Sequence, residues 1–156
     1  MRAYFFGNFY LSSIQQGIQA LHCVSDMFVQ YGHESNHART LLYDWAANHK
    51  VVVLLNGGNA ESLRETYLSF RNLCGELRYP YGTFSEDAES LDSARTCVGV
   101  IVPEGIYKYN EIEREQRQSR SMNPSPLGNI FVSNPWQLNA TEKALAGIID
   151  AAPLAR

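Results

Sequence analysis

Cysteine is scarce in this chain of 156 residues, and its three copies form no recognisable pair. Cys23, Cys74 and Cys97 lie far apart, each in an apolar context. No CxxC or CxxxH spacing offers a zinc site, and we expect buried, reduced thiols in a reducing compartment. The sequence therefore predicts no metal site, and nothing in it calls for a cofactor.

Long apolar runs and a strong charge of one sign are also missing. No segment approaches the ~20 apolar residues that a membrane-spanning helix needs, and residues 1–11 lack the apolar core and cleavage site of a signal peptide. We therefore expect a cytoplasmic protein with no membrane partner. The net charge of -3 gives no general attraction to phosphate backbones, so a nucleic-acid partner would need a local basic patch.

What is present is an alternation of strand and helix patterns in a chain of one-domain length. The expected elements, in chain order, are strand 2–6, helix 12–31, helix 32–50, strand 50–55, helix 59–73, strand 75–84 and strand 95–102. This β-α-α-β-α-β-β order predicts an α/β fold with a small mixed sheet of about four strands and helices on both faces.

Two of these elements carry sharper expectations. The run Lys50–Leu55 shows no polar alternation, so we expect a central strand with both faces buried. In the first helix, apolar residues recur at spacings of three and four, which predicts its buried face. These residues are Ile14, Ile18, Leu21, Val24 and Phe28.

The character of the chain changes after residue 107. Residues 108–156 are expected to form a C-terminal extension that packs on the same domain or on a dimer partner. A charged segment predicts a helix and then a loop, and Asn139 with Glu142 forms a capping-box pattern before a last helix. The apolar groups "NIFV" and "ALAGII" predict an interface in a homodimer or higher homo-oligomer.

The element order and four short motifs resemble the type 2 peptidyl-tRNA hydrolase family. "QQGIQALHCV" is similar to a helix signature of that family and places Gln19 and His22 on its Gln and His. "DWAANHKVVV", "SEDAES" and "TCVGVIVP" resemble motifs that follow in the same order, the last with Thr96 on the strand's Thr. The resemblance covers about residues 1–107 and implies the fold of that family, with tRNA as partner and peptidyl-tRNA hydrolysis as activity.

The departures from that family concern its chemistry. The family's catalytic Lys falls on Gln15, and the glycine of its "DAG" loop falls on Glu89. A lysine can contact phosphate or activate water, whereas a glutamine can only form hydrogen bonds. We therefore expect no catalytic residue here, and the hydrolase is retained as an alternative.

The chain also resembles small bacteriophage proteins that sequester nucleotide immune signals, among them the Thoeris anti-defence family that binds cyclic ADP-ribose isomers. The likeness lies in a small sheet domain, an aromatic residue in a late loop and arginines after the last strand. It implies a non-catalytic protein of the host cytoplasm that binds a small phosphorylated nucleotide. A third possibility is an interaction module whose extension docks a host protein.

Two groups of side chains are candidates for the site. Gln15, Gln19 and His22 share one face near a helix N-terminus, where amides could read a ribose or base edge. Alternatively, Gln19 and His22 satisfy buried backbone groups.

The second group comprises arginines and aromatic residues. Arg114, Arg117 and Arg120 recur at spacings of three and could clamp phosphate, for which guanidinium groups are well suited. Phe84 or Tyr107 could stack a base beside them. The alternative is that these arginines form ion pairs with glutamates of the same helix.

Overall fold

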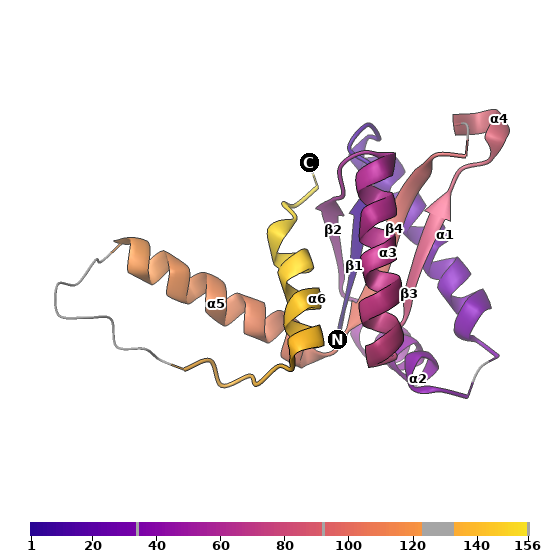
Figure 1. Ribbon diagram of the computed structural model, residues 1–156. Coiled ribbons are helices and arrows are strands. Elements are labelled where there is room, and N and C mark those ends of the chain that lie inside the picture. Colours follow the sequence, from indigo (N-terminus) through magenta and orange to yellow (C-terminus); the bar gives the residue numbers. More distant parts are fainter. Residues whose placement is uncertain (34, 92, 123–132, 156) are drawn as a thin grey trace.

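The computed structural model describes residues 1–33, 35–91, 93–122 and 133–155 and shows the α/β fold that the sequence predicts (Figure 1). Its elements, in chain order, are β1 (Arg2–Gly7), α1 (Ser13–Tyr31), α2 (His37–Asp44), the π-helical turn η1 (Trp45–His49), β2 (Val52–Asn56), α3 (Ala60–Leu77), β3 (Tyr81–Ser85), α4 (Ala88–Leu91), β4 (Arg95–Val102), α5 (Glu104–Met122) and α6 (Ala140–Ala151). The predicted order of elements and the small mixed sheet are confirmed.

The sheet has the strand order β2-β1-β4-β3, with β1 and β2 parallel and the other pairs antiparallel. The prediction that Lys50–Leu55 is central is therefore wrong: β2 is an edge strand, and Val52 is 49% exposed. The C-terminal residues cover part of this edge, because Asn56 N–H donates to Pro153 O (2.8 Å) and Ala155 N–H to Leu54 O (3.0 Å). An apolar run thus tolerates an edge position where the chain's own tail shields it.

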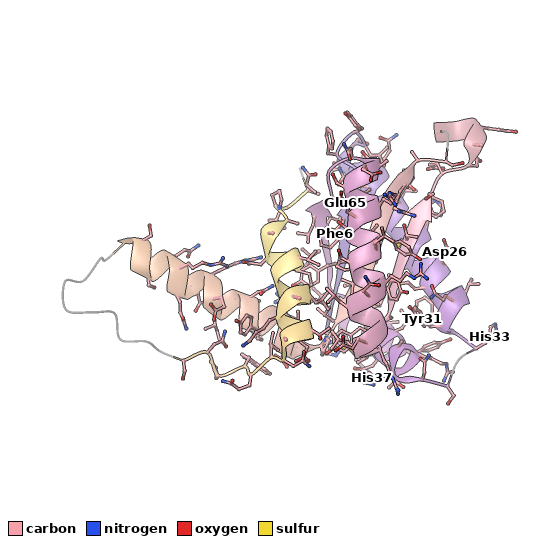
Figure 2. All side chains as sticks on the ribbon, in the orientation of Figure 1. Phe6, Asp26, Tyr31, His33, His37 and Glu65 are labelled. Carbon is pink, nitrogen blue, oxygen red and sulfur yellow. The ribbon has the colours of Figure 1, made fainter. Side chains whose placement is uncertain are left out.

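Helices cover both faces of the sheet, as predicted. One face packs against α3, α6 and the first turn of α5, and the other against α1 and α2 (Figure 1). Residues alternate between these faces along β4, so Val98 and Val100 point to the α3 side and Cys97 to the α1 side. On the α3 side, Phe6 packs edge-on against Phe70 with ring centroids 5.4 Å apart (Figure 2).

The last helix belongs to this core. Leu145, Ala146 and Ile149 of α6 are buried beside α3, so these residues of the apolar "ALAGII" segment pack within their own chain. The "NIFV" segment at 129–132 lies outside the described residues. Helix α5 continues across residue 107 without a break and extends away from the sheet (Figure 1).

The buried face of α1 also differs from the prediction. Ile14, Ile18 and Leu21 are exposed, and Val24 and Phe28 are partly buried. The sheet-facing side chains are instead Gln16, Gln19, Ala20, Cys23, Met27 and Tyr31.

Two glycines explain why this side of α1 is buried. Gly82 of β3 pairs directly with Gly99 of β4. A Cβ on Gly82 would lie 2.8 Å from Met27 Cγ, and one on Gly99 would lie 2.5 Å from Phe5 Cε1. The helix therefore lies close over a hollow in the sheet, where small or unbranched side chains fit best.

Candidate functional site

Five side chains meet where β3 ends and β4 begins, and we call them the sheet-end cluster: Gln19, His22, Phe84, Glu86 and Thr96. The buried Gln19 amide donates from Nε2 to Glu86 Oε1 (2.7 Å) and accepts at Oε1 from Thr96 Oγ1 (2.9 Å). The exposed His22 ring stacks on Phe84 with ring centroids 4.7 Å apart. Three of the predicted ligand-binding residues, Gln19, His22 and Phe84, are thus brought together.

Gln19 makes its polar contacts in this cluster with other side chains. Gln19 satisfies a carboxylate and a hydroxyl, and not the backbone groups that one alternative expected. Thr96 also reaches Phe84 O at 3.4 Å. A positioned carboxylate and an exposed imidazole are groups that general acid–base chemistry uses.

Gln15 caps the N-terminus of α1 and does not join the sheet-end cluster. Its Oε1 accepts from Ser12 N–H and from Ser12 Oγ, both at 2.9 Å, and its own N–H donates to Ser12 Oγ at 3.4 Å. These bonds form a capping box that satisfies free backbone donors at the start of α1. The position on which the family's catalytic Lys falls therefore closes a helix end here.

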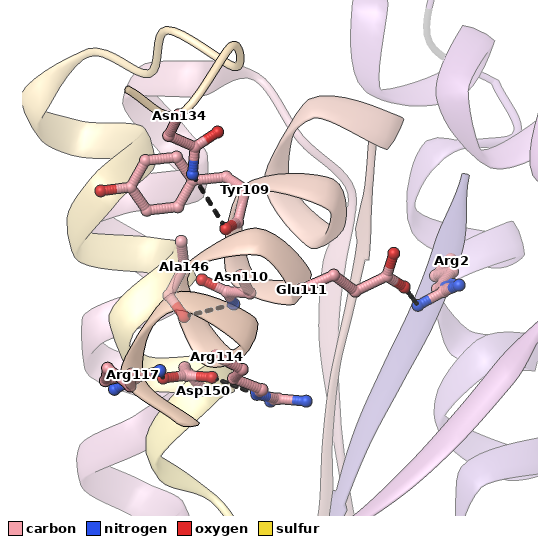
Figure 3. A network of polar contacts seen from close by, with 9 residues as sticks. All are labelled: Arg2, Tyr109, Asn110, Glu111, Arg114, Arg117, Asn134, Ala146 and Asp150. Carbon is pink, nitrogen blue, oxygen red and sulfur yellow. Dashed lines mark hydrogen bonds and ion pairs between the residues drawn. The ribbon is translucent and has the colours of Figure 1, made fainter. Parts of the chain in front are cut away.

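A second group of polar residues lies on the opposite face of the sheet, where α5 crosses α6 (Figure 3). Arg114 Nε and Arg117 Nη2 each donate to a different carboxylate oxygen of Asp150. Arg2 Nη1 donates to Glu111 Oε1 at 2.7 Å. Arg114 and Arg117 therefore pair with a residue of α6 and not with glutamates of their own helix, as the alternative expected.

A groove of about 320 Å³ runs between these residues and the edge of the sheet. We call it the arginine groove, and its lining consists of Arg2, Tyr4, Val53, Leu55, Arg114, Asp150, Ala152, Pro153 and Leu154. The lining thus combines charged or polar side chains with apolar ones. Arg117 and Asp150 also line a neighbouring hollow of about 240 Å³, with Lys143.

The charges around the arginine groove perturb its ionisable groups. Partial burial acts to raise the pKa of Asp150, but hydrogen bonds from Arg117 and Arg114 outweigh it and bring the pKa below its ordinary value. Burial raises the pKa of Tyr4, and the nearby Arg2 guanidinium opposes that rise. Asp150 is thus held as a carboxylate and Tyr4 as a neutral phenol near pH 7.

The remaining predicted residues do not form one site with these. The Arg2 guanidinium lies 4.0 Å from the ring centroid of Tyr107, so it covers a face that a base would need. Phe84 packs on the α1 side of the sheet, whereas Tyr107 packs on the α3 side. The side chain of Arg120 lies outside the described residues. Within one chain, the expected single pocket is therefore divided in two.

Three residues of the arginine groove were missed from the sequence: Arg2, Tyr4 and Asp150. Arg2, Tyr4 and Phe6 occupy every second position of β1 and therefore lie on the same face of the sheet. This pattern could have predicted that Arg2 and Tyr4 are neighbours. Asp150 is the single charged residue in the last two turns of α6. That isolated charge was the available signal, but its partners on α5 follow only from the packing of two helices.

The described residues are also informative about metals and membranes. They contain no group of three or more His, Cys, Asp or Glu side chains arranged to hold a metal ion. The three cysteines are free and buried, and burial raises the pKa of Cys74 to about 12. Within the same part of the chain, no helix combines the length and apolar character needed to cross a bilayer.

Comparison with known proteins adds no relative. No protein-family model matches the chain, and no curated protein is similar to it in sequence.

Proposed function

We propose that the chain binds a small phosphorylated nucleotide in the arginine groove and does not turn it over. The observation that carries this proposal is the mixed polar and apolar lining of the groove. Arg2, Tyr4 and Arg114 offer donors to an anion, and Val53 and Leu154 offer an apolar wall to a base. A few convergent polar groups beside apolar side chains are typical of small-molecule sites, and the volume is at the lower end of their range.

The charge balance supports an anionic ligand. Arg114 and Arg117 share one carboxylate, so the local sum is positive even with Asp150 ionised. Both arginine side chains are at least half exposed and can turn from Asp150 toward a phosphate. Guanidinium groups bind phosphate oxygens in pairs, which gives strength and direction.

The ligand class that we propose is a cyclic nucleotide immune signal, such as a cyclic ADP-ribose isomer, which a phage anti-defence protein would sequester. Its support is the resemblance described above together with the donors of the arginine groove. Sequestration requires that the bound nucleotide leaves the protein unchanged.

Calorimetric titration with a panel of linear and cyclic nucleotides, cyclic ADP-ribose isomers included, tests the proposal. Arg114→Ala and Arg117→Ala should each lower the affinity for a nucleotide that the wild type binds by at least a factor of ten. A hydrogen bond to a charged group contributes about 1.5–3 kcal/mol, and 1.4 kcal/mol is a factor of ten in affinity. Arg64→Ala is the matched control, since Arg64 is an exposed arginine paired with Glu61 on α3.

Three results would contradict the proposal. The first is equal affinity in the wild type, Arg114→Ala and Arg117→Ala. The second is a chromatogram in which the nucleotide recovered from the protein has been hydrolysed. The third is that no nucleotide of the panel binds at millimolar concentration, which would reject the ligand class.

The sheet-end cluster favours a second function, hydrolysis of peptidyl-tRNA. Gln19, His22 and Thr96 fall on residues of the hydrolase signatures. Gln19 donates to the carboxylate of Glu86, Thr96 donates to Gln19, and His22 stacks on Phe84. Release of the peptide from peptidyl-tRNA by the wild type would support this function. Because Gln15 caps α1, Gln15→Lys tests whether a lysine at that position adds activity, and an inactive wild type with an inactive Gln15→Lys variant would reject it.

A further inference from the structure

The side of α1 that points away from the sheet is an uncovered apolar surface. Ile14, Leu21 and Val29 are 77%, 62% and 75% exposed, and Ile18 lies between them on the same side. With Ser25, these residues form the outer α1 stripe: Ile14, Ile18, Leu21, Ser25 and Val29. Their spacing of three and four places them directly opposite the sheet-facing side of the helix, and α1 lies on the outside of its layer (Figure 1).

Charge is nearly absent from this helix. Among the 19 residues of α1, Asp26 is the single Asp, Glu, Lys or Arg, and its exposed side chain is labelled in Figure 2. A helix that meets water on one side usually carries several charged side chains there. A charged partner therefore finds no complementary charge on the stripe, whereas an identical copy meets no repulsion.

We infer that the outer α1 stripe is the interface of a homodimer in which two copies of α1 pack antiparallel. The stripe is nearly symmetric about the point between Leu21 and His22, so a two-fold axis there is self-complementary. It places Ile14 of one copy against Val29 of the other and Leu21 next to the axis. The two copies of Asp26 then lie about 14 Å apart along the helices, so the two carboxylates stay apart.

The area of the stripe sets the strength of this dimer. Its four apolar side chains expose on the order of 400 Å² in each copy. With the flanking polar residues, pairing two copies buries on the order of 1,000 Å², which is the size of weak, reversible complexes. The dimer is thus in exchange with monomer at micromolar concentrations.

This interface also lies next to the sheet-end cluster. His22 is adjacent to the axis and stacks on Phe84 in its own chain. The dimer brings two such stacks to the two sides of the axis. The inference does not depend on the proposed nucleotide site, which lies on the other face of the sheet.

Sedimentation velocity over a range of about 1–300 µM tests the association. The wild type should shift from monomer to dimer, and Leu21→Glu should raise the dissociation constant at least tenfold, because it buries a carboxylate next to the axis. Leu68→Glu is the matched control, since Leu68 is an exposed leucine of α3, 40% accessible. Circular dichroism of both variants checks the fold, which should be unchanged because both leucines are exposed.

Engineered cysteines test the antiparallel arrangement. The three native cysteines are fully buried, so a new surface cysteine is the one that reacts under mild oxidation. Leu21→Cys should form a covalent dimer. Ile14→Cys alone should not, because the two copies of residue 14 lie about 22 Å apart along the helices, whereas Ile14→Cys mixed with Val29→Cys should cross-link.

Three outcomes would overturn the inference. A wild type that stays monomeric throughout the concentration range rejects the homodimer. A dimer that Leu21→Glu leaves intact uses another surface. Cross-linking of Ile14→Cys to itself shows a parallel arrangement and rejects the two-fold axis proposed here.

Discussion

Replacement of Gln19 by glutamate probes the sheet-end cluster through pH. In the wild type, Gln19 Nε2 donates to Glu86 Oε1 at 2.7 Å. In Gln19→Glu, an acceptor takes the place of that donor, and two carboxylates face each other at hydrogen-bond distance. Like charges this close do not both stay ionised, so one carboxyl group of the pair takes up a proton and its pKa rises.

The size of the effect follows from the cost of that proton. A glutamate has an ordinary pKa of about 4.3, and each pH unit above it costs about 1.4 kcal/mol to keep the group protonated. The loss of stability at pH 7 therefore has a ceiling of about 3.7 kcal/mol, and we expect about 2–3.5 kcal/mol because Glu86 is partly exposed. Near pH 4.5 the loss of stability should fall below about 1 kcal/mol, since the protonated carboxyl group introduced by Gln19→Glu can donate a hydrogen bond as the amide does.

The direction of this pH dependence is set by the folded state. The folded-state pKa of the carboxyl pair in Gln19→Glu lies above the unfolded value, so the folded state binds more protons. Its stability is complete below the unfolded pKa and is lost as pH rises through the folded one. Urea unfolding at pH 4.5, 5.5 and 7.0 measures this trend.

Two variants separate this explanation from a simple loss of packing. Gln30→Glu places the same change at an exposed position of α1 and should alter the stability by less than about 0.5 kcal/mol. The double variant Gln19→Glu, Glu86→Gln restores one amide and one carboxylate and should recover most of the stability at pH 7. A loss that is independent of pH, or a double variant no more stable than Gln19→Glu, would refute the reasoning.

Other changes test the packing and the charges elsewhere. Asp150→Asn should lower the free energy of unfolding by about 1 kcal/mol in urea at pH 7. Because the pKa of Asp150 is lowered in the folded state, this difference from the wild type should disappear as pH falls through that pKa. A difference that persists at low pH would contradict the ion pairs. Gly99→Ala should cost about 1–3 kcal/mol, since a Cβ there would lie 2.5 Å from Phe5. Gly75→Ala should add about 0.5–1 kcal/mol to the free energy of unfolding, because Gly75 lies in the last turn of α3 and its Cβ would meet nothing within 4 Å. Removal of residues 153–156 should lower the melting temperature and increase light scattering on heating, since it uncovers the edge of β2.

The parts of the fold that the sequence predicts best are local. Ser12, Asn59 and Asn139 each cap the helix that was expected, because the capping bond joins residues three apart in the chain. Leu63 and Phe70 are buried in α3 as their helical spacing indicates. These features depend on neighbours in sequence and need no knowledge of the rest of the fold.

The two wrong predictions about the fold, the central position of β2 and the buried face of α1, share a physical cause. The apolar run of β2 is compatible with a central place, and strand order follows from how the whole chain packs. The apolar face of α1 is compatible with burial, but the pairing of Gly82 with Gly99 leaves a hollow that the side with Ala20 and Cys23 fits better. Both outcomes depend on residues far away in the sequence.

The candidate site was predicted in pieces. The spacing of Arg114 and Arg117 correctly places them on one side of a helix, because both reach the same carboxylate. Phe84 and His22 were expected to bind ligand with different partners and instead stack on each other. Helical spacing shows which residues share a face but not which element lies opposite.

Asp150 determines what an anion must do to bind here. Its carboxylate holds Arg114 and Arg117 with separate oxygens, and it lines both the arginine groove and the neighbouring hollow. A single phosphate competes with Asp150 for one guanidinium and meets the repulsion of the carboxylate. A ligand with two phosphates can reach Arg114 from the groove and Arg117 from the hollow, so two charge-assisted contacts offset that repulsion. If the proposed function holds, a diphosphate should therefore bind more tightly than a monophosphate, and Asp150→Asn should narrow that difference in affinity.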